Sequence, residues 1–210
     1  MQRRNETKDD GFERSLMNII LASNNAGKIA EFSALLAPLD YHITPQKEFN
    51  IVDVAETGLT FIENALQKAR NAATLTGLPA LADDSGLVVP ALNGAPGIYS
   101  ARYAGEKANA QMNINKLLAD MTDFQQEQRR AWFYCVLVFL RHANDPSPII
   151  AQGSWHGEIL MAPRGAQGFG YDPIFWLADL QKSSAELPLE LKNALSHRGK
   201  ALQSLIAQLR

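Results

Sequence analysis

Two adjacent acids, Asp83 and Asp84, are residues that could bind a metal ion and activate water. They lie between apolar stretches at 78–81 and 87–89, which predict two short buried strands, and Ser85-Gly86 follows them as a turn. Because neighbouring side chains on a strand point to opposite faces, we expect one acid to enter a site, and we assign Asp84. The alternative is a pair of turn-forming aspartates at a strand end.

A polar loop at 23–28 follows a β-rich run at 18–22 and precedes a helical pattern. Free backbone N–H groups at a helix N-terminus, together with the cation of Lys28, suit a polyphosphate. The loop has one glycine and no Ser or Thr after the lysine, so a capped helix start is the alternative interpretation. The predicted phosphate contacts are Ser23, Asn24, Asn25, Ala26, Gly27 and Lys28.

A third acid, Glu56, lies in a loop just before a strongly patterned helix. We place Asn64 and Lys68 away from the apolar stripe of that helix. Glu56 could be a second oxygen ligand that joins Asp84 around Mg²⁺, with water and substrate phosphates completing the shell. The alternative is an acid that stabilises the helix dipole. No metal-spaced pair of His or Cys competes for this role.

Towards the C-terminus, glycines on both sides of Phe169 leave an aromatic ring that can stack on a flat base. Asp172 follows and could accept a hydrogen bond from a ring N–H, while Lys192 and the segment 196–200 supply cationic donors. The alternatives are an aromatic plug in a turn and a solvated helix start capped by Ser196.

Together these segments resemble the inosine triphosphate pyrophosphatases, the Ham1-like family. The resemblance runs from about residue 18 to the end and is carried by seven motifs in the family's order, at 23–28, 56–58, 61–65, 82–86, 94–103, 168–173 and 196–199. Many members have two successive acids where this chain has Ala55-Glu56. Whether Asp53 or water supplies the supporting contact stays open.

The resemblance implies an α/β fold with a long, twisted mixed sheet, helices in two lobes around a central nucleotide cleft, and a homodimer. It also implies hydrolysis of ITP, dITP and XTP to the monophosphate and pyrophosphate, with Asp84 and Lys28 catalytic and Mg²⁺ held by Glu56 and Asp84. Besides the phosphate loop, the implied substrate contacts are Ser85, Phe169, Gly170, Tyr171, Asp172, Lys192, His197 and Arg198.

Composition agrees with one enzyme domain at 17–210 preceded by a disordered extension at 1–16. The 210 residues carry 20 Lys and Arg against 22 Asp and Glu, so a nucleic-acid-binding surface has no support from net charge. The apolar run 131–140 is about half the ~20 residues of a membrane helix and predicts a central strand buried on both faces. Cys135, the single cysteine, lies within it, which suits a reducing cytoplasm.

The remaining pattern predicts a hairpin connection at 141–148 and helices at 109–121 and 200–209, the first with Met112, Leu117 and Leu118 facing inward. Mixed strands and helices in this order predict an α/β class. Two other functions stay open. A nucleotide sensor needs no pair such as Glu56 and Asp84, and a pyrophosphatase could act on a modified pyrimidine triphosphate instead.

Overall fold

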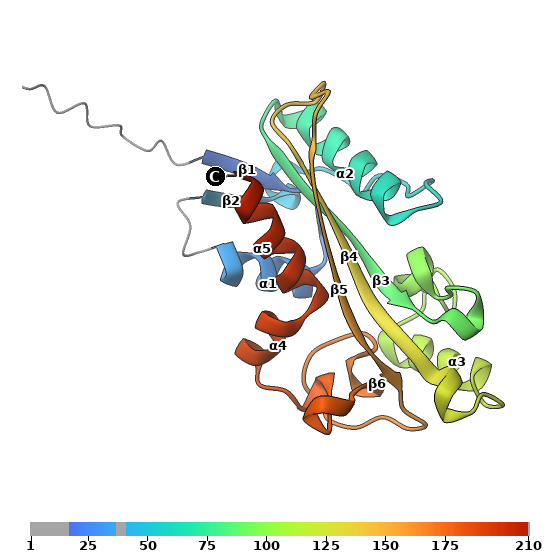
Figure 1. Cartoon of the computed structure of the whole chain (residues 1–210). Helices are drawn as coiled ribbons and strands as arrows, with labels where there is room; N and C mark the ends of the chain where they lie inside the picture. Colours follow the sequence, from blue (N-terminus) through green and yellow to red (C-terminus); the bar gives the residue numbers. More distant parts are fainter. Residues whose placement is uncertain (1–16, 37–40, 210) are drawn as a thin grey trace, which may run out of the picture.

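Within residues 17–36 and 41–209, which the computed structural model describes, seven strands form one mixed sheet with helices on both faces (Figure 1). The sheet order is β2-β1-β3-β4-β5-β6-β7. β1 runs parallel to β2 and β3, and every pair from β3 to β7 is antiparallel. The strands are β1 (Met17–Leu21), β2 (Tyr41–Pro45), β3 (Ala80–Val88), β4 (Arg130–Leu140), β5 (Ile149–Ile159), β6 (Phe175–Leu177) and β7 (Lys182–Ser183).

The predicted α/β fold and mixed sheet are confirmed, as are the hairpin at 141–148 and the buried central strand β4. The predicted extension at 1–16 lies outside the described residues. None of the described helices is long and apolar enough to span a membrane. The helices are α1 (Ala26–Leu36), α2 (Phe61–Thr76), α3 (Ala110–Asp120), α4 (Leu189–Leu195) and α5 (His197–Leu209), and a 3-10 helix, η3, spans Gly97–Arg102.

Alternation along the strands divides the core between the two faces of the sheet. Leu81 of β3 and Cys135 of β4 pack on one face with residues of α1 and α5, whereas Ala82 and Val136 pack on the other face with alanines of α2. A third cluster lies at the far end of the sheet and includes Leu117 of α3. Successive residues of β3 therefore meet different helices, as side-chain alternation requires.

The end of α3 is tied to the end of β5 by Arg129, which is 1% exposed. Its guanidinium donates to the carbonyl oxygens of Met121 and Ile159 at 2.7 Å and of Leu160 at 3.0 Å. Burial lowers the pKa of this guanidinium. The three bonds satisfy carbonyl groups at the ends of two elements, and the carbonyl oxygen of Met121 also accepts from the backbone N–H of Phe124 at 3.2 Å.

Three expectations about elements were wrong. The stretches at 78–81 and 87–89 are not two strands with a turn between them, because β3 runs unbroken from Ala80 to Val88 with both acids in its middle. Met112 does not face inward but is 47% exposed, while Leu117 is buried. The last helix begins at His197 rather than at residue 200.

Candidate active site

The polar loop after β1 is a capped helix start. The side chain of Asn25 accepts a hydrogen bond from the backbone N–H of Lys28 at 3.1 Å, and the hydroxyl of Ser23 accepts one from the N–H of Asn25 at 3.3 Å. Asn24 donates to Asp53 at 3.0 Å, so Asp53 holds the loop. These bonds fix the loop at the N-terminus of α1, where anion binding stays a prediction.

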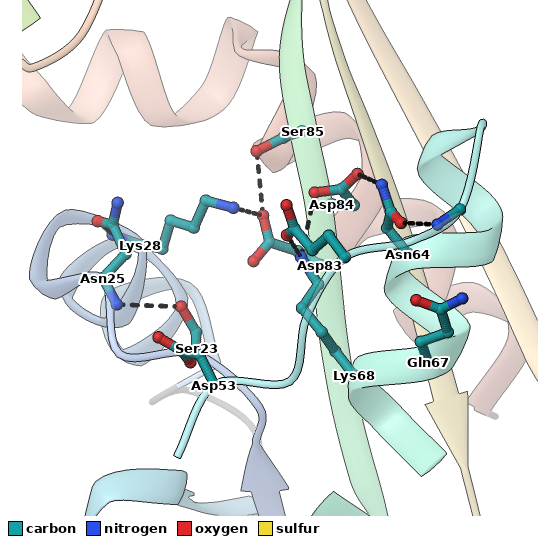
Figure 2. A network of polar contacts seen from close by, with 12 residues as sticks. Ser23, Asn25, Lys28, Asp53, Asn64, Gln67, Lys68, Asp83, Asp84 and Ser85 are labelled. Carbon is teal, nitrogen blue, oxygen red and sulfur yellow. Dashed lines mark hydrogen bonds and ion pairs between the residues drawn. The ribbon is translucent and has the colours of Figure 1, made fainter. Parts of the chain in front are cut away.

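Lys28 and Asp83 form an ion pair of 2.8 Å on the face of β3 that meets α1 and α5 (Figure 2). The second oxygen of Asp83 has no hydrogen-bond partner among the described residues. Burial opposes ionisation of this carboxyl, yet the cations of Lys28, Arg198 and Lys68 outweigh it and hold the pKa of Asp83 below its usual range. Asp83 therefore stays charged and fixes the direction of Lys28.

Asp84 points to the other face of β3, towards α2 (Figure 2). Lys68 donates to its carboxylate at 3.1 Å, and Asn64 approaches the second oxygen at 3.4 Å. Burial raises the pKa of Asp84, and the cations of Lys68 and Lys28 offset that rise only in part. The buried carboxyl is therefore a stronger base than an exposed aspartate.

Glu56 lies in the loop before α2, as predicted, and shares Lys68 with Asp84. Lys68 donates to one oxygen of Glu56 at 2.9 Å, and Arg102 of η3 donates to the other at 2.9 Å. Burial opposes the charge of Glu56, but these two cations lower its pKa overall. The sequence interpretation missed Lys68, whose signal was its place two helical turns after the Glu56 loop.

A divalent cation fits this pair of acids. Glu56 and Asp84 contact the same ammonium nitrogen, that of Lys68, at 2.9 and 3.1 Å, so both carboxylates face one positive charge. Among residues 17–36 and 41–209, no three His, Cys, Asp or Glu side chains gather closely enough to hold a metal ion. Two carboxylates with open positions suit Mg²⁺, which keeps waters and takes substrate phosphates as ligands.

Phe169 lines the cleft beside the loop at 23–28. Its ring is 39% exposed, and a Cβ built on Gly27 would lie 3.2 Å from two ring carbons. Lys192 and Arg198 lie 4.8 and 5.6 Å from the ring centroid. The backbone N–H of Phe169 donates to Asp172 at 2.8 Å, which fixes the loop that carries the ring.

Buried ion pairs connect the predicted base-reading residues. Lys192 donates to Asp172 at 2.7 Å and approaches Glu31 of α1 at 3.4 Å, and Arg198 also binds Glu31. Arg198 donates to Ser85 at 3.2 Å. Glu31 was missed by the sequence interpretation, although it lies three residues after Lys28, one helical turn along the same face of α1.

His197 is buried, so a solvated helix start was the wrong interpretation of this segment. Its ring stacks on Phe133 with 4.9 Å between centroids and an interplanar angle of 13°. Burial, assisted by the cations of Arg198 and Lys192, holds the pKa of His197 well below its usual value. The ring is therefore neutral near pH 7.

These groups line one cleft of 820 Å³, and its walls include every predicted site residue except Ala26. Arg102 and Asn113, which the sequence interpretation did not assign, also line it. The predicted phosphate, metal and base contacts thus belong to one continuous space, which the acids of β3 also line. Such an arrangement can hold an elongated anion with a flat end.

Known proteins are similar to this chain in sequence and in fold. The model of the Ham1 family matches residues 19–208. The dITP/XTP pyrophosphatase of Photobacterium profundum is 56% identical over 195 residues, which cover 93% of this chain and 99% of that protein. The dITP/XTP pyrophosphatase of Vibrio cholerae is 57% identical over 190 residues, which cover 90% and 95%.

Solved structures agree. A HAM1 protein from Coxiella burnetii superposes with a TM-score of 0.86 at 50% identity and covers 92% of this chain and 98% of its own. A nucleoside-triphosphatase, or dITP/XTP pyrophosphatase, from Mycobacterium abscessus gives a TM-score of 0.74 at 39% identity, with coverages of 92% and 100%. The resemblance that the seven motifs indicated is therefore confirmed, and the chain belongs to the Ham1 family.

Proposed function

We propose that this protein hydrolyses ITP, dITP and XTP to the corresponding monophosphate and pyrophosphate, and so removes them from the nucleotide pool. The observation that carries the proposal is the single cleft that joins an exposed ring, Phe169, to the acids of β3. The names of the two relatives described above, dITP/XTP pyrophosphatases, support dITP and XTP as substrates.

In the proposed reaction, Asp84 orients a water molecule and takes its proton as the oxygen attacks the α-phosphorus. The bond from this phosphorus to the bridging oxygen breaks, and pyrophosphate leaves towards the loop at 23–28. Lys28 is held near the reacting groups by Asp83 and stabilises the charge of the leaving group. Mg²⁺ held by Glu56 and Asp84 would neutralise part of the phosphate charge.

Base selection follows from the polar edge beyond Phe169. Hypoxanthine and xanthine carry a 6-oxo group and a protonated N1, whereas adenine presents an amino group and a bare N1. Lys192 and Arg198 offer donors to the oxygen, and Asp172 offers an acceptor to N1. Adenine presents the opposite pattern of donor and acceptor to these groups, which disfavours ATP. Guanine shares the favoured edge, so its rejection must come from the surroundings of its 2-amino group.

We also propose Mg²⁺ as the cofactor, the cytoplasm as the location and a homodimer as the assembly. The paired carboxylates support the first, and the buried single cysteine, Cys135, suits the second. The family resemblance supports the homodimer.

A panel of nucleoside triphosphates, with separate detection of pyrophosphate and phosphate, tests the proposal. We expect pyrophosphate from ITP, dITP and XTP, little from ATP, and dependence on Mg²⁺. Release of inorganic phosphate as the first product would refute attack at the α-phosphorus. Preference for a modified pyrimidine triphosphate would replace the substrate class, and tight binding without turnover would indicate a sensor.

A further inference from the structure

Along the wall of the cleft, a second set of contacts links the base loop, residues 168–173, to Glu56. Tyr171 lies between Phe169 and Asp172, and its side chain is buried. Its hydroxyl donates to the carbonyl oxygen of Ser100, in η3, at 2.9 Å. This bond joins segments that are 71 residues apart and is itself buried. A buried hydrogen bond of this kind fixes the distance between the base loop and η3.

η3 is in turn fixed to the strand that carries Asp84. The hydroxyl of Ser100 donates to the carbonyl oxygen of Gly97 at 2.6 Å and accepts from the backbone N–H of Leu87 at 2.9 Å. A Cβ at Gly86 would overlap both the Gly97 carbonyl and the Ser100 hydroxyl. Only glycine allows η3 to lie this close to β3.

At the end of η3, Arg102 sets the position of Glu56. Its guanidinium donates to Glu56 at 2.9 Å, lies 5.3 Å from the centre of the Tyr99 ring, and is 3.7 Å from the carboxylate of Glu106. Glu56 lies in a segment without helix or strand, and its other oxygen binds Lys68. No helix or strand fixes the backbone of this segment, so the contacts with Arg102 and Lys68 determine where the Glu56 carboxylate points.

We propose that Arg102 and Tyr171 are positioning residues. The contacts Tyr171–Ser100 and Arg102–Glu56 form a bridge through η3, called the η3 bridge below. It connects the loop predicted to bind the base with Glu56, the acid predicted to hold the metal. The inference rests on the proposed function. Neither side chain needs to touch the reacting atoms, because the bridge acts through geometry. Displacement of a catalytic group by about 1 Å can cost roughly 10²-fold in rate.

Three variants with one matched control test the bridge by kinetics. Tyr171→Phe removes one hydroxyl without changing charge, and we expect kcat for ITP to fall about fivefold while KM stays within about twofold. Arg102→Gln should lower kcat further. The double variant should lie within about twofold of Arg102→Gln, because Tyr171 acts through the same bridge. Tyr134→Phe, which removes a hydroxyl bonded to Gln152 at 2.7 Å, should behave as the wild type.

Metal binding without turnover gives an independent readout. Mn²⁺ is titrated by electron paramagnetic resonance in the presence of an ITP analogue with an imido bridge between its α and β phosphates. We expect Tyr171→Phe to weaken Mn²⁺ binding about fivefold, although the hydroxyl that it removes bonds to Ser100 and not to Glu56 or Asp84. Tyr134→Phe should leave Mn²⁺ binding unchanged.

Each of three results would overturn the bridge. The first is an unchanged Mn²⁺ affinity in Tyr171→Phe, the second is fully additive losses of kcat in the double variant, and the third is a change in KM without a change in kcat. These outcomes are distinct from failure of the proposed function. A wild-type protein that releases no pyrophosphate from ITP refutes that function, whereas the Mn²⁺ titration still decides whether the bridge exists.

Discussion

The ammonium group of Lys68 lies 3.1 Å from the carboxylate of Asp84, on the face of β3 that α2 covers. Burial would favour a neutral Asp84, and Lys68 opposes this by stabilising the charged form. The acidic groups in turn raise the pKa of Lys68, so the lysine stays protonated. The pair leaves a buried acid whose pKa is raised and which is therefore more basic than an exposed aspartate.

Asp84→Asn should remove most turnover while nucleotide binding stays measurable. The amide keeps the shape of the side chain but loses the charge and basicity that metal and water require. Steady-state kinetics with ITP and equilibrium binding of the imido analogue measure the two effects. Asp179→Asn, which makes the same change at an exposed acid, is the matched control. Near wild-type turnover of Asp84→Asn would refute the assignment.

Phe169→Ala should raise KM for ITP, because the base loses its stacking platform. Base–aromatic stacking contributes roughly 1–3 kcal/mol, which corresponds to about a fivefold to hundredfold change. Leu180→Ala removes a side chain with nearly the same exposed fraction, 38% against 39%, and should leave KM unchanged. An unchanged KM in Phe169→Ala would place the base elsewhere.

Arg198→Ala should lower kcat/KM for ITP more than for ATP, by a gap of about 1–3 kcal/mol if a buried polar contact to the base is lost. The contacts of Arg198 with Glu31 and Ser85 add an effect common to both substrates. Kinetics with the two nucleotides separate the contributions. Equal losses would assign Arg198 to the buried ion pairs or to the phosphates.

His197 should make the folded state less stable as the pH falls below about 6.5, the usual histidine value. Because burial lowers its pKa in the folded protein, the unfolded chain binds the proton first, so stability is complete above 6.5 and is lost as pH decreases. Urea unfolding at pH values between 7.5 and 5 measures how the free energy of unfolding changes with pH. For one proton we expect a slope of at most about 1.4 kcal/mol per pH unit.

The variant His197→Gln should flatten that slope. His156→Gln, at an exposed histidine, is the control and should keep the wild-type slope. A slope that is the same in all three proteins would contradict the prediction.

Arg129→Met should lower the free energy of unfolding by about 2 kcal/mol or more, since three carbonyl oxygens lose the guanidinium donor and two of these bonds are buried. Arg130→Met removes the neighbouring charge at an exposed position and should change stability by less than about 0.5 kcal/mol. Urea unfolding compares the two. Equal effects would mean that the charge, rather than the buried bonds, matters.

Local patterns were enough to predict the strand–loop–helix around Lys28, the Glu56 loop and the buried strand β4, because each depends on periodicity and turn residues close in sequence. The local sequence pattern led to a wrong prediction for β3. Polar residues at 83–86 resemble a turn when read alone, yet tertiary contacts supply Asp83 with Lys28 and Asp84 with Lys68, and the strand continues.

The missed residues of the site share a cause. Glu31, Lys68 and Arg102 act through partners that are distant in sequence. Helical spacing places Glu31 and Lys68 on the correct helix faces, but it does not reveal which charges the fold brings to them. The prediction for Met112 was wrong for a different reason. An apolar residue near a helical period was assigned to the core, but the start of α3 leaves that side chain exposed.

Side chains of β3 alternate between the two faces of the sheet, and this has a consequence for judging whether a protein preparation is correctly folded. Asp83 meets α1 and α5 while Asp84 meets α2, and β4 holds this arrangement by pairing Asp84 with Val136. A slip by one residue would present each acid to the wrong helices. A misfolded sheet could keep its strand content and apolar core and still be inactive. Specific activity therefore reports the fraction of molecules whose strands are correctly aligned, which circular dichroism would not detect.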